Sequence, residues 1–270
     1  MKPLILITND DGITSPGLRA AAEALLDIGE LLIVAPKNQQ TGMGRSFPRG
    51  TNTGIIEILY LELRGNKLFP FYAVTGSPAQ AVAHGILEIA ERQPNICISG
   101  VNYGENLGGT NFISGTLGAA MEAASHGVPS LAISIGSASY EKYEKPFSVR
   151  DWNIIFYFIR KLTTDVLRNG LYQNVAVLNV NIPSEATIDT PVRITSQSQQ
   201  NYYTCVKPEK RNFSRSFSLP LKVEVDYKNL EKDSDIYAFC IDKVISVTPI
   251  GKELTVRDKE GNPCSIFNKK

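Results

Sequence analysis

The sequence lacks the features that mark several large classes of protein. Its 270 residues include only four cysteines, none in a C-x-x-C pair, so neither a zinc ribbon nor a dense disulfide framework is expected. The apolar start at residues 4–7 is interrupted by Asn9, Asp10 and Asp11, and no run approaches the roughly 20 residues that span a membrane. We therefore expect a cytoplasmic chain with no membrane partner.

An excess of charge of either sign is also missing. The 28 basic and 27 acidic side chains leave a formal net charge of +1. This balance provides no overall field that would hold a polyanion against salt. Nucleic acid is therefore not expected as a partner.

Several common motifs of nucleotide-binding proteins and hydrolases are absent. No G-x-x-x-x-G-K-[ST] occurs, and residues 42–44 lack the third glycine of a dinucleotide fingerprint. There is no G-x-S-x-G elbow, and the pair Asp10-Asp11 differs from the D-x-D of aspartyl-phosphate hydrolases. These absences disfavour the usual NTPases, dehydrogenases and enzymes with a covalent intermediate.

The sequence does contain a repeated alternation of short apolar runs and helical patterns. Residues 3–8 form a continuous apolar run, residues 18–26 have apolar side chains at helical spacing, and residues 31–35 form a second run. The alternation continues with a helix at 81–90, a strand at 96–99, a helix at 116–125 and a strand at 130–134. This order predicts an α/β protein with a doubly wound, mostly parallel sheet.

The pattern changes in the second half of the chain. A helix is expected at residues 152–167 and a strand at 174–182, whereas residues 185–240 mix short β-like runs with polar loops. We therefore expect three regions. They are a catalytic core at 1–184, a β-rich arm with a return strand at 185–250 that is exchanged between subunits, and a tail at 251–270.

Polar, glycine-rich segments follow three of the predicted core strands, at residues 8–12, 35–46 and 99–106. In doubly wound sheets, ligands bind beyond the carboxyl ends of the strands. The three loops are therefore expected to converge on one site.

These loops carry oxygen ligands suited to a hard cation. Asp10 and Asp11 supply two carboxylates, while Thr41 offers a hydroxyl and Asn102 an amide oxygen, as Mg²⁺, Mn²⁺ or Ca²⁺ would require. Each signal has a simpler alternative when taken alone: Asn9 to Gly12 is rich in turn formers, Thr41 fits a solvated loop, and Asn102 fits a turn.

Residues 114–120 place hydroxyls and glycine immediately before an alanine-rich helix. Ser114 and Thr116 could therefore help to bind phosphate at the helix N-terminus, where backbone N–H groups are free. Ordinary helix capping by the same two residues is the alternative. His84 and His126 fall on predicted helices without a partner at ligand spacing, so we assign them no catalytic role.

Taken together, these segments resemble the SurE (survival protein E) family of 5′/3′-nucleotidases over about residues 3–250. The resemblance rests on four blocks, at residues 5–12, 34–46, 98–106 and 114–122.

The resemblance implies a Rossmann-like fold and a C-terminal arm exchanged in a homodimer or homotetramer. It also implies one divalent metal ion per subunit, most simply Mg²⁺ or Mn²⁺, held by Asp10, Asp11, Thr41 and Asn102. The chain departs from the family pattern at Thr41, where serine is usual, and at Gln80, where aspartate is usual. Residues 195–200 lack arginines often found there.

The predicted function is hydrolysis of nucleoside 5′-monophosphates, with 3′-monophosphates as a further option. Asn9, Ser114 and Thr116 would position the phosphate, and Asp10 would act as a metal ligand or as the base for the attacking water. Two alternatives remain. One is a nucleotide-binding or regulatory module without turnover, and the other is a phosphatase for a non-nucleotide phosphomonoester or a polyphosphate.

Overall fold

The structure is a computed structural model that describes residues 1–136, 150–258 and 261–264. Its centre is a nine-stranded sheet in the order β3-β4-β2-β1-β5-β6-β7-β11-β8. The strands are β1 (Leu4–Thr8), β2 (Glu30–Pro36), β3 (Ile56–Leu63), β4 (Lys67–Val74), β5 (Ile96–Tyr103), β6 (Ser130–Ile135), β7 (Val177–Ile182), β8 (Val192–Ile194) and β11 (Ile245–Ile250).

The six strands from β4 to β7 in this order run parallel to one another. Strand β3 is antiparallel to β4, and β11 is antiparallel to β7 but parallel to β8. The central strands β1 and β6 are buried along their whole length, as their continuous apolar runs predict for strands covered on both faces. The doubly wound, mostly parallel α/β sheet predicted from the sequence is confirmed.

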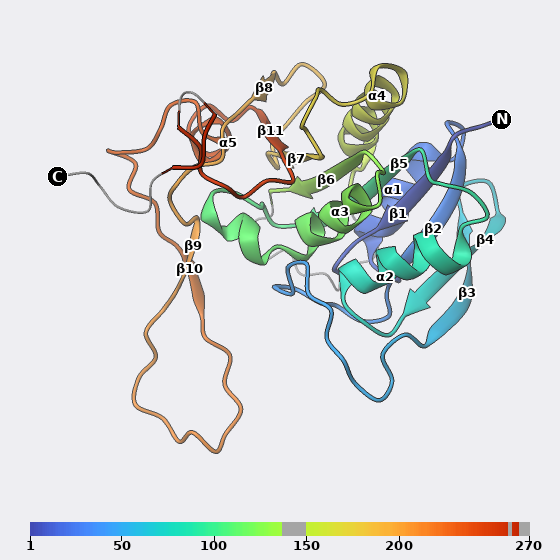
Figure 1. Ribbon diagram of the computed structural model, residues 1–270, viewed down its shortest axis with the longest axis horizontal. Helices are drawn as coiled ribbons and strands as arrows, with labels where there is room; N and C mark the ends of the chain where they lie inside the picture. Colours follow the sequence, from blue (N-terminus) through green and yellow to red (C-terminus); the bar gives the residue numbers. More distant parts are fainter. Residues whose placement is uncertain (137–149, 259–260, 265–270) are drawn as a thin grey trace.

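Helices cover both faces of the sheet (Figure 1). The helical elements are α1 (Pro16–Leu25), α2 (Pro78–His84) with its π-helical continuation η1 (Gly85–Ile89), the 3-10 turn η2 (Gly109–Ile113), α3 (Gly115–Ser125), α4 (Asn153–Asn169) and α5 (Asp235–Cys240). Helices α1 and α4 pack together in one core, and α2 and α3 pack against each other over the opposite face. Within the described ranges, none of the helices combines the length and apolarity needed to cross a membrane.

Serine side chains fix the starts of four helices. Ser15, Ser77, Ser114 and Ser234 each accept a hydrogen bond from the backbone N–H three residues later, at the starts of α1, α2, α3 and α5. Each bond satisfies one of the amide groups that a helix leaves unpaired at its first turn. The helix starts are therefore determined by local sequence.

The direction of winding reverses between β1 and β5. The chain passes from β1 through α1 to β2 on one side of β1, and it later returns through α2 to β5 on the other side. Loops that leave two neighbouring strands in opposite directions open a crevice at this switch point. Asp10 and Asp11 follow β1 directly, and Asn102 lies near the end of β5.

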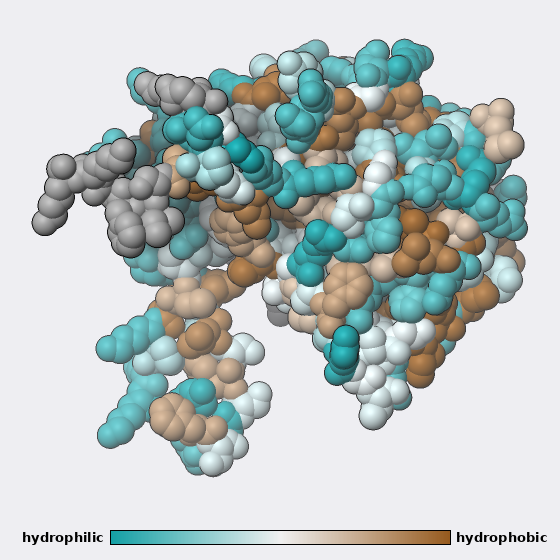
Figure 2. All heavy atoms as spheres, viewed as in Figure 1, coloured by the Kyte–Doolittle hydropathy of each residue, from teal (hydrophilic) through white to brown (hydrophobic). Residues whose placement is uncertain are grey.

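A hairpin projects from the body of the molecule in the predicted arm region. Strands β9 (Tyr203–Cys205) and β10 (Leu221–Val223) pair antiparallel and lead to a long loop at the tip (Figure 1). Figure 2 shows apolar residues along this hairpin. The same region also contains α5 and the return strand β11, and part of the predicted 251–270 tail lies outside the described residues.

Some elements differ from the sequence prediction. The expected strand at 96–99 continues to Tyr103, because pairing with β6 resumes after a register shift between Gly100 and Asn102. The expected helix at 81–90 begins at Pro78 and turns π-helical at Gly85. The hairpin β3–β4 and helix α5 were not predicted.

Candidate active site

Asp10 and Asp11 lie in the crevice at the switch point and are almost completely buried. Their exposed fractions are 3% and 9%. Ionised carboxylates are rarely buried without a compensating positive charge or several hydrogen bonds. The pair therefore requires a specific partner.

The first turn of α3 holds the Asp10 carboxylate. The Thr116 hydroxyl donates a hydrogen bond of 2.7 Å to Asp10 Oδ1. Gly115 lies so close that a Cβ atom there would stand 2.7 Å from Asp10 Oδ2. The positive end of the helix dipole thus faces this carboxylate, and Thr116 orients it.

Asp11 has a different environment. Among the described residues, neither of its carboxylate oxygens meets a hydrogen-bond partner of ordinary geometry. Burial, followed by the charge of Asp10, raises the pKa of Asp11 to about 8, and a backbone amide of Tyr103 opposes the shift. Burial also raises the pKa of Asp10 to about 6, although bonds from Thr116 lower it. The pair provides an anionic pocket that a cation would stabilise.

The loop after β2 runs beside this pair. The backbone N–H of Gln40 donates to the Asp10 carbonyl at 2.7 Å. Thr41 follows in an exposed position, and its Oγ1 accepts a hydrogen bond of 2.9 Å from Gln39 Nε2. The hydroxyl predicted as a metal ligand therefore belongs to a loop that is anchored to Asp10.

Asn102 is buried on the other side of the crevice, in β5. Its Nδ2 donates to the Gly104 carbonyl at 2.6 Å, so Oδ1 is the atom that this side chain can offer to a ligand. In the described part of the chain, no group of three or more His, Cys, Asp or Glu side chains has the geometry of a metal site. A cation here would depend on two carboxylates and neutral oxygens, a donor set that suits Mg²⁺ or Mn²⁺.

The remaining predicted site residues also have structural partners. Ser114 Oγ accepts a hydrogen bond of 3.1 Å from the Leu117 amide as the cap of α3. Asn9 is buried, and its Nδ2 donates to the Gly12 carbonyl and to Ser15 Oγ, which shapes the turn after β1. The alternatives of capping for Ser114 and a turn for Asn9 are therefore realised, and neither excludes contact with a ligand.

An asparagine network that sequence reasoning missed supports the loop after β5. The carbonyl of Asn106 accepts hydrogen bonds from Nδ2 of both Asn179 and Asn181, while Asn106 Nδ2 donates to Ser134 Oγ at 2.7 Å. Asn179 and Asn181 are buried and alternate along β7. Two asparagines at period two inside an apolar strand are the signal that could have identified them.

A second missed contact fixes the loop that carries Thr41. Arg45 Nε donates to Glu122 Oε2 at 2.7 Å, and Glu122 is buried on α3. The backbone of Gly44 packs directly on the helix, because a Cβ atom at Gly118 would lie 2.2 Å from the Gly44 carbonyl oxygen. Helix α3 thus positions both Asp10 and this loop.

Gln80, the position at which the chain departs from the expected aspartate, links α2 to the same region. Its Oε1 accepts from the Ser77 amide, and its Nε2 donates to the Pro48 carbonyl at 2.8 Å. An aspartate could not donate the second bond. Gln80 therefore holds the chain that continues from the Arg45 loop.

Comparison with known proteins agrees with this architecture. The family described as "Survival protein SurE" matches residues 5–204. A 5′-nucleotidase SurE of Methanosarcina acetivorans is 36% identical, with 95% of each chain covered, and one of Methanocella arvoryzae is 38% identical, with 93% of this chain and 92% of the relative covered. The crystal structure of the SurE protein from Aquifex aeolicus superposes with a TM-score of 0.71 and 28% identity, covering 94% of this chain and 95% of that one. With a family match over most of its length and relatives this similar, the chain belongs to the SurE family.

Proposed function

We propose that this chain is a metal-dependent phosphatase that hydrolyses nucleoside 5′-monophosphates, and in addition 3′-monophosphates, to nucleoside and phosphate. Its relatives are named 5′-nucleotidases. The observation that carries the proposal is the buried Asp10–Asp11 pair at the switch point, in which neither oxygen of Asp11 meets a hydrogen-bond partner of ordinary geometry among the described residues. Two adjacent buried carboxylates without a cationic side chain bonded to them are suited to a metal ion and, through it, to a phosphoryl group.

The proposed cofactor is one divalent ion per subunit, Mg²⁺ or Mn²⁺, with Asp10, Asp11, Thr41 and Asn102 as its ligands. When bound, such an ion supplies Lewis-acid stabilisation of the charge that develops on the phosphoryl oxygens. The Asp11 oxygens, which lack a hydrogen-bond partner of ordinary geometry among the described residues, and the all-oxygen donor set support this assignment.

The side chains of the crevice have distinct proposed roles in the reaction. Asp10, held by Thr116, accepts the proton of the attacking water or serves only as a ligand, since both roles need the same position. Water adds to phosphorus, the bond between phosphorus and the ester oxygen breaks, and the nucleoside leaves as an alcohol after taking up a proton. Asn9, Ser114 and the amides at the start of α3 position the phosphate.

Phosphate release from a panel of nucleotides, phosphomonoesters and polyphosphate tests the function. We expect release from nucleoside monophosphates with Mg²⁺ or Mn²⁺ and none with EDTA. Nucleotide binding without release would instead favour a regulatory module. Release from polyphosphate or another ester alone would favour the second alternative.

The proposed assembly is a homodimer or homotetramer held together by residues 185–250. Several apolar side chains of the β9–β10 hairpin are exposed within one chain. An isolated two-stranded hairpin is at best marginally stable in water, which supports exchange with another copy.

A further inference from the structure

Three polar residues form one row across neighbouring strands, near the carboxyl ends of β5, β6 and β7. Asn102 of β5 is paired in register with Ser134 of β6, and Ser134 is paired with Asn181 of β7. Asn102 is the proposed metal ligand, whereas Asn181 is completely buried two strands away. The loop that follows β5 connects the two.

The side chain of Asn181 bonds the backbone of this loop at two points. Its Oδ1 accepts a hydrogen bond of 2.8 Å from the Asn106 amide, and its Nδ2 donates one of 3.0 Å to the Asn106 carbonyl. An asparagine side chain offers both a donor and an acceptor, so it can pair with a peptide group as another strand would. A buried backbone group that loses such a partner is costly, so these bonds fix the position of Asn106.

The second asparagine of β7 makes a smaller contribution. Asn179 Nδ2 also donates to the Asn106 carbonyl, at 2.9 Å, but Asn179 Oδ1 meets no hydrogen-bond partner among the described residues. Asn181 therefore accepts the Asn106 amide, which Asn179 does not reach.

The position of Asn106 determines the orientation of Asn102. Asn102 Nδ2 donates to the Gly104 carbonyl at 2.6 Å, and this bond leaves Oδ1 for a ligand. Gly104 has a φ of 103°, which favours glycine, and its amide donates to the Ile135 carbonyl at 2.9 Å. A single residue separates Gly104 from Asn106, so a shift of Asn106 would also move the carbonyl that orients Asn102.

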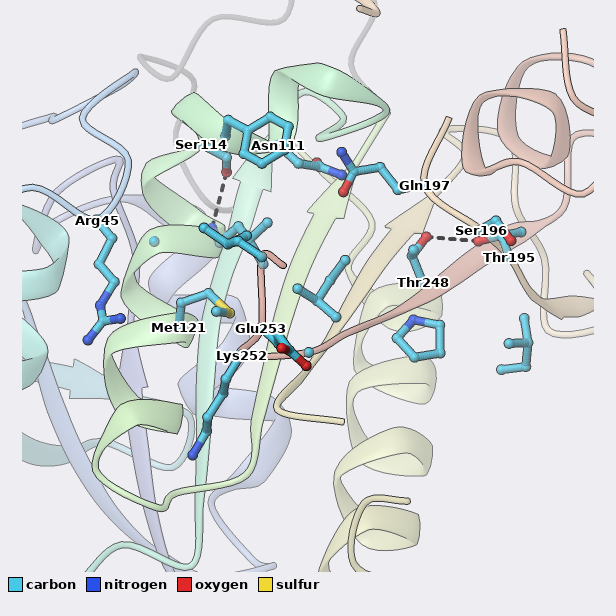
Figure 3. A pocket seen from close by; sticks show the side chains of 18 of the residues that line it. Arg45, Asn111, Ser114, Met121, Thr195, Ser196, Gln197, Thr248, Lys252 and Glu253 are labelled. Atoms are coloured by element: carbon cyan, nitrogen blue, oxygen red, sulfur yellow. Dashed lines mark hydrogen bonds between the residues drawn. The ribbon is translucent and has the colours of Figure 1, made fainter. Parts of the chain in front are cut away.

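The far end of the loop is held by a separate contact. The Gly108 amide donates to the buried carboxylate of Asp235 at 2.9 Å. Figure 3 shows Asn111 and Ser114, which follow along the chain and lead into α3. Loss of the Asn181 bonds should therefore loosen the residues around Asn106 without detaching the start of α3.

We propose that Asn181 is a positioning residue for the metal site. It holds the backbone of Asn106, which fixes the Gly104 carbonyl, and this carbonyl orients Oδ1 of Asn102 toward the cation. Asn181 acts through Asn102 and is not itself a ligand. This inference rests on the proposed metal-dependent function and deepens it, because it extends the site to β7.

Calorimetry with Mn²⁺ on Asn181→Ala tests this role, with Ser246→Ala as the matched control. Ser246 is also buried, lies opposite Asn181 on β11, and bonds Thr195 instead of the loop. We expect Asn181→Ala to bind Mn²⁺ at least about tenfold more weakly than wild type, as loss of a group that orients a ligand typically does. Ser246→Ala should remain within about twofold. Wild-type Mn²⁺ affinity in a folded Asn181→Ala protein would overturn the proposal.

Hydrogen–deuterium exchange of the metal-free protein tests the contact without metal or turnover. The Asn106 amide should exchange at least about tenfold faster in Asn181→Ala than in wild type or Ser246→Ala, because its bond to Oδ1 is lost. The Gly108 amide should keep its rate, since Asp235 still holds it. Equal exchange of the Asn106 amide in the three proteins would contradict the assignment.

Phosphate release from nucleotides separates this proposal from the proposed function. If Mn²⁺ affinity depends on Asn181 but no nucleotide is hydrolysed, the nucleotidase function fails and the positioning role stands. Absence of Mn²⁺ binding by wild type would overturn the positioning role.

Asn181→Ser is a second variant in case Asn181→Ala fails to fold. A single hydroxyl cannot serve both the amide and the carbonyl of Asn106, so Mn²⁺ binding should weaken and exchange at Asn106 should accelerate. Wild-type values for both in Asn181→Ser would also overturn the proposal.

Discussion

The two adjacent aspartates occupy different environments, and this difference determines what each substitution should do. Asp10 is oriented by Thr116, whereas Asp11 lacks a partner of ordinary geometry among the described residues. We expect Asp10→Asn and Asp11→Asn to reduce metal-dependent phosphate release by roughly 100-fold or more, since each removes an anionic oxygen without changing volume. Circular dichroism should show folded proteins. Wild-type turnover in both variants would exclude this site.

Thr41 permits a test that separates its hydroxyl from the rest of the loop. Thr41→Ser keeps the oxygen and should be mild, whereas Thr41→Val keeps the shape and removes the proposed donor. We expect the valine variant to bind Mn²⁺ about tenfold or more weakly, as judged by calorimetry. Equal Mn²⁺ affinity in wild type, Thr41→Ser and Thr41→Val would show that Thr41 is not a ligand.

Burial of the carboxylate pair should make stability depend on pH. The pKa of Asp11 is raised from 3.8 to about 8, so the folded protein holds a proton that the unfolded chain releases. The proton bound by Asp11 therefore stabilises the folded state. This stabilisation is complete below the pKa of the unfolded chain and is lost as the pH rises through the pKa of the folded protein. We expect the free energy of unfolding of the metal-free wild type to fall between about pH 5.5 and about pH 8.5. The fall should be smaller in Asp11→Asn, which lacks this titrating group.

Urea unfolding in EDTA at the two pH values measures this effect, and the difference between the two proteins removes contributions from other groups. Saturating Mn²⁺ should reverse the trend in wild type, because the ion binds the ionised carboxylates. An identical pH dependence in wild type and Asp11→Asn would contradict the role assigned to burial.

The sequence allowed the position of the carboxylates to be predicted but not their contacts. Asp10, Asp11 and Asn102 follow or end neighbouring parallel strands, so their proximity follows from strand order alone. The bond from Thr116 to Asp10 joins residues 106 positions apart, and no local pattern encodes it. Such pairs depend on how α3 packs over the sheet, which only the complete fold determines.

At the scale of elements, α3 connects the parts of the site. Its first turn holds Asp10, and the backbone of Gly44 packs against the helix at Gly118. A Cβ atom added at Gly118 would lie 2.2 Å from the Gly44 carbonyl oxygen. We expect Gly118→Ala to displace the Thr41 loop and to weaken Mn²⁺ binding about tenfold, although alanine favours the helix itself. Weaker metal binding without loss of stability would be the distinctive result.

Gly50→Ala is a suitable control for this substitution. It lies further along the same loop, where an added Cβ would meet only the Thr53 hydroxyl at 3.4 Å. Calorimetry with Mn²⁺ and urea unfolding of the metal-free proteins should show wild-type affinity for Gly50→Ala. Wild-type affinity for Mn²⁺ in Gly118→Ala would mean that the position of the Thr41 loop does not depend on the contact between Gly44 and Gly118.

Helices and strands with a clear hydrophobic pattern in the sequence were predicted, and those with a weak hydrophobic pattern were not. Strands β1 and β6 are buried on both faces, so their apolar runs were easily recognised. Strand β3 is a half-exposed edge strand, and its partner β4 contains Pro70, which removes a backbone donor. Helix α5 is six residues long, too short for helical periodicity to register.

At the scale of the whole molecule, the β9–β10 hairpin is the feature that does not pack against the body of its own chain. It projects from the body, and its apolar side chains remain in solvent (Figures 1 and 2). Phe213 is 87% exposed, and Leu219, Leu221 and Val223 are about half exposed, at 51%, 55% and 47%. Complete burial of an exposed side chain of this kind contributes about 1.5–3 kcal/mol, and the three half-exposed residues would gain about half of that each, so these contacts would favour association with another copy.

The hairpin also connects to the site at its base. The Tyr203 hydroxyl donates to Glu105 Oε1 at 2.9 Å, and Glu105 belongs to the loop after β5. Substitutions near the tip should therefore affect assembly, whereas those at the base would also disturb the loop that follows β5, the strand in which Asn102 lies.

Light scattering at micromolar concentration tests the proposed assembly. We expect the intact protein to be a dimer or a tetramer, and we expect Leu221→Lys with Val223→Lys to weaken or abolish assembly, since two buried charges oppose an apolar contact. Lys222→Arg is the control, as it lies between them and preserves the charge. These changes leave Tyr203 in place, so Mn²⁺ binding at the Asp10–Asp11 pair should persist unless the site needs its neighbour. A monomeric intact protein would refute the exchange of the arm.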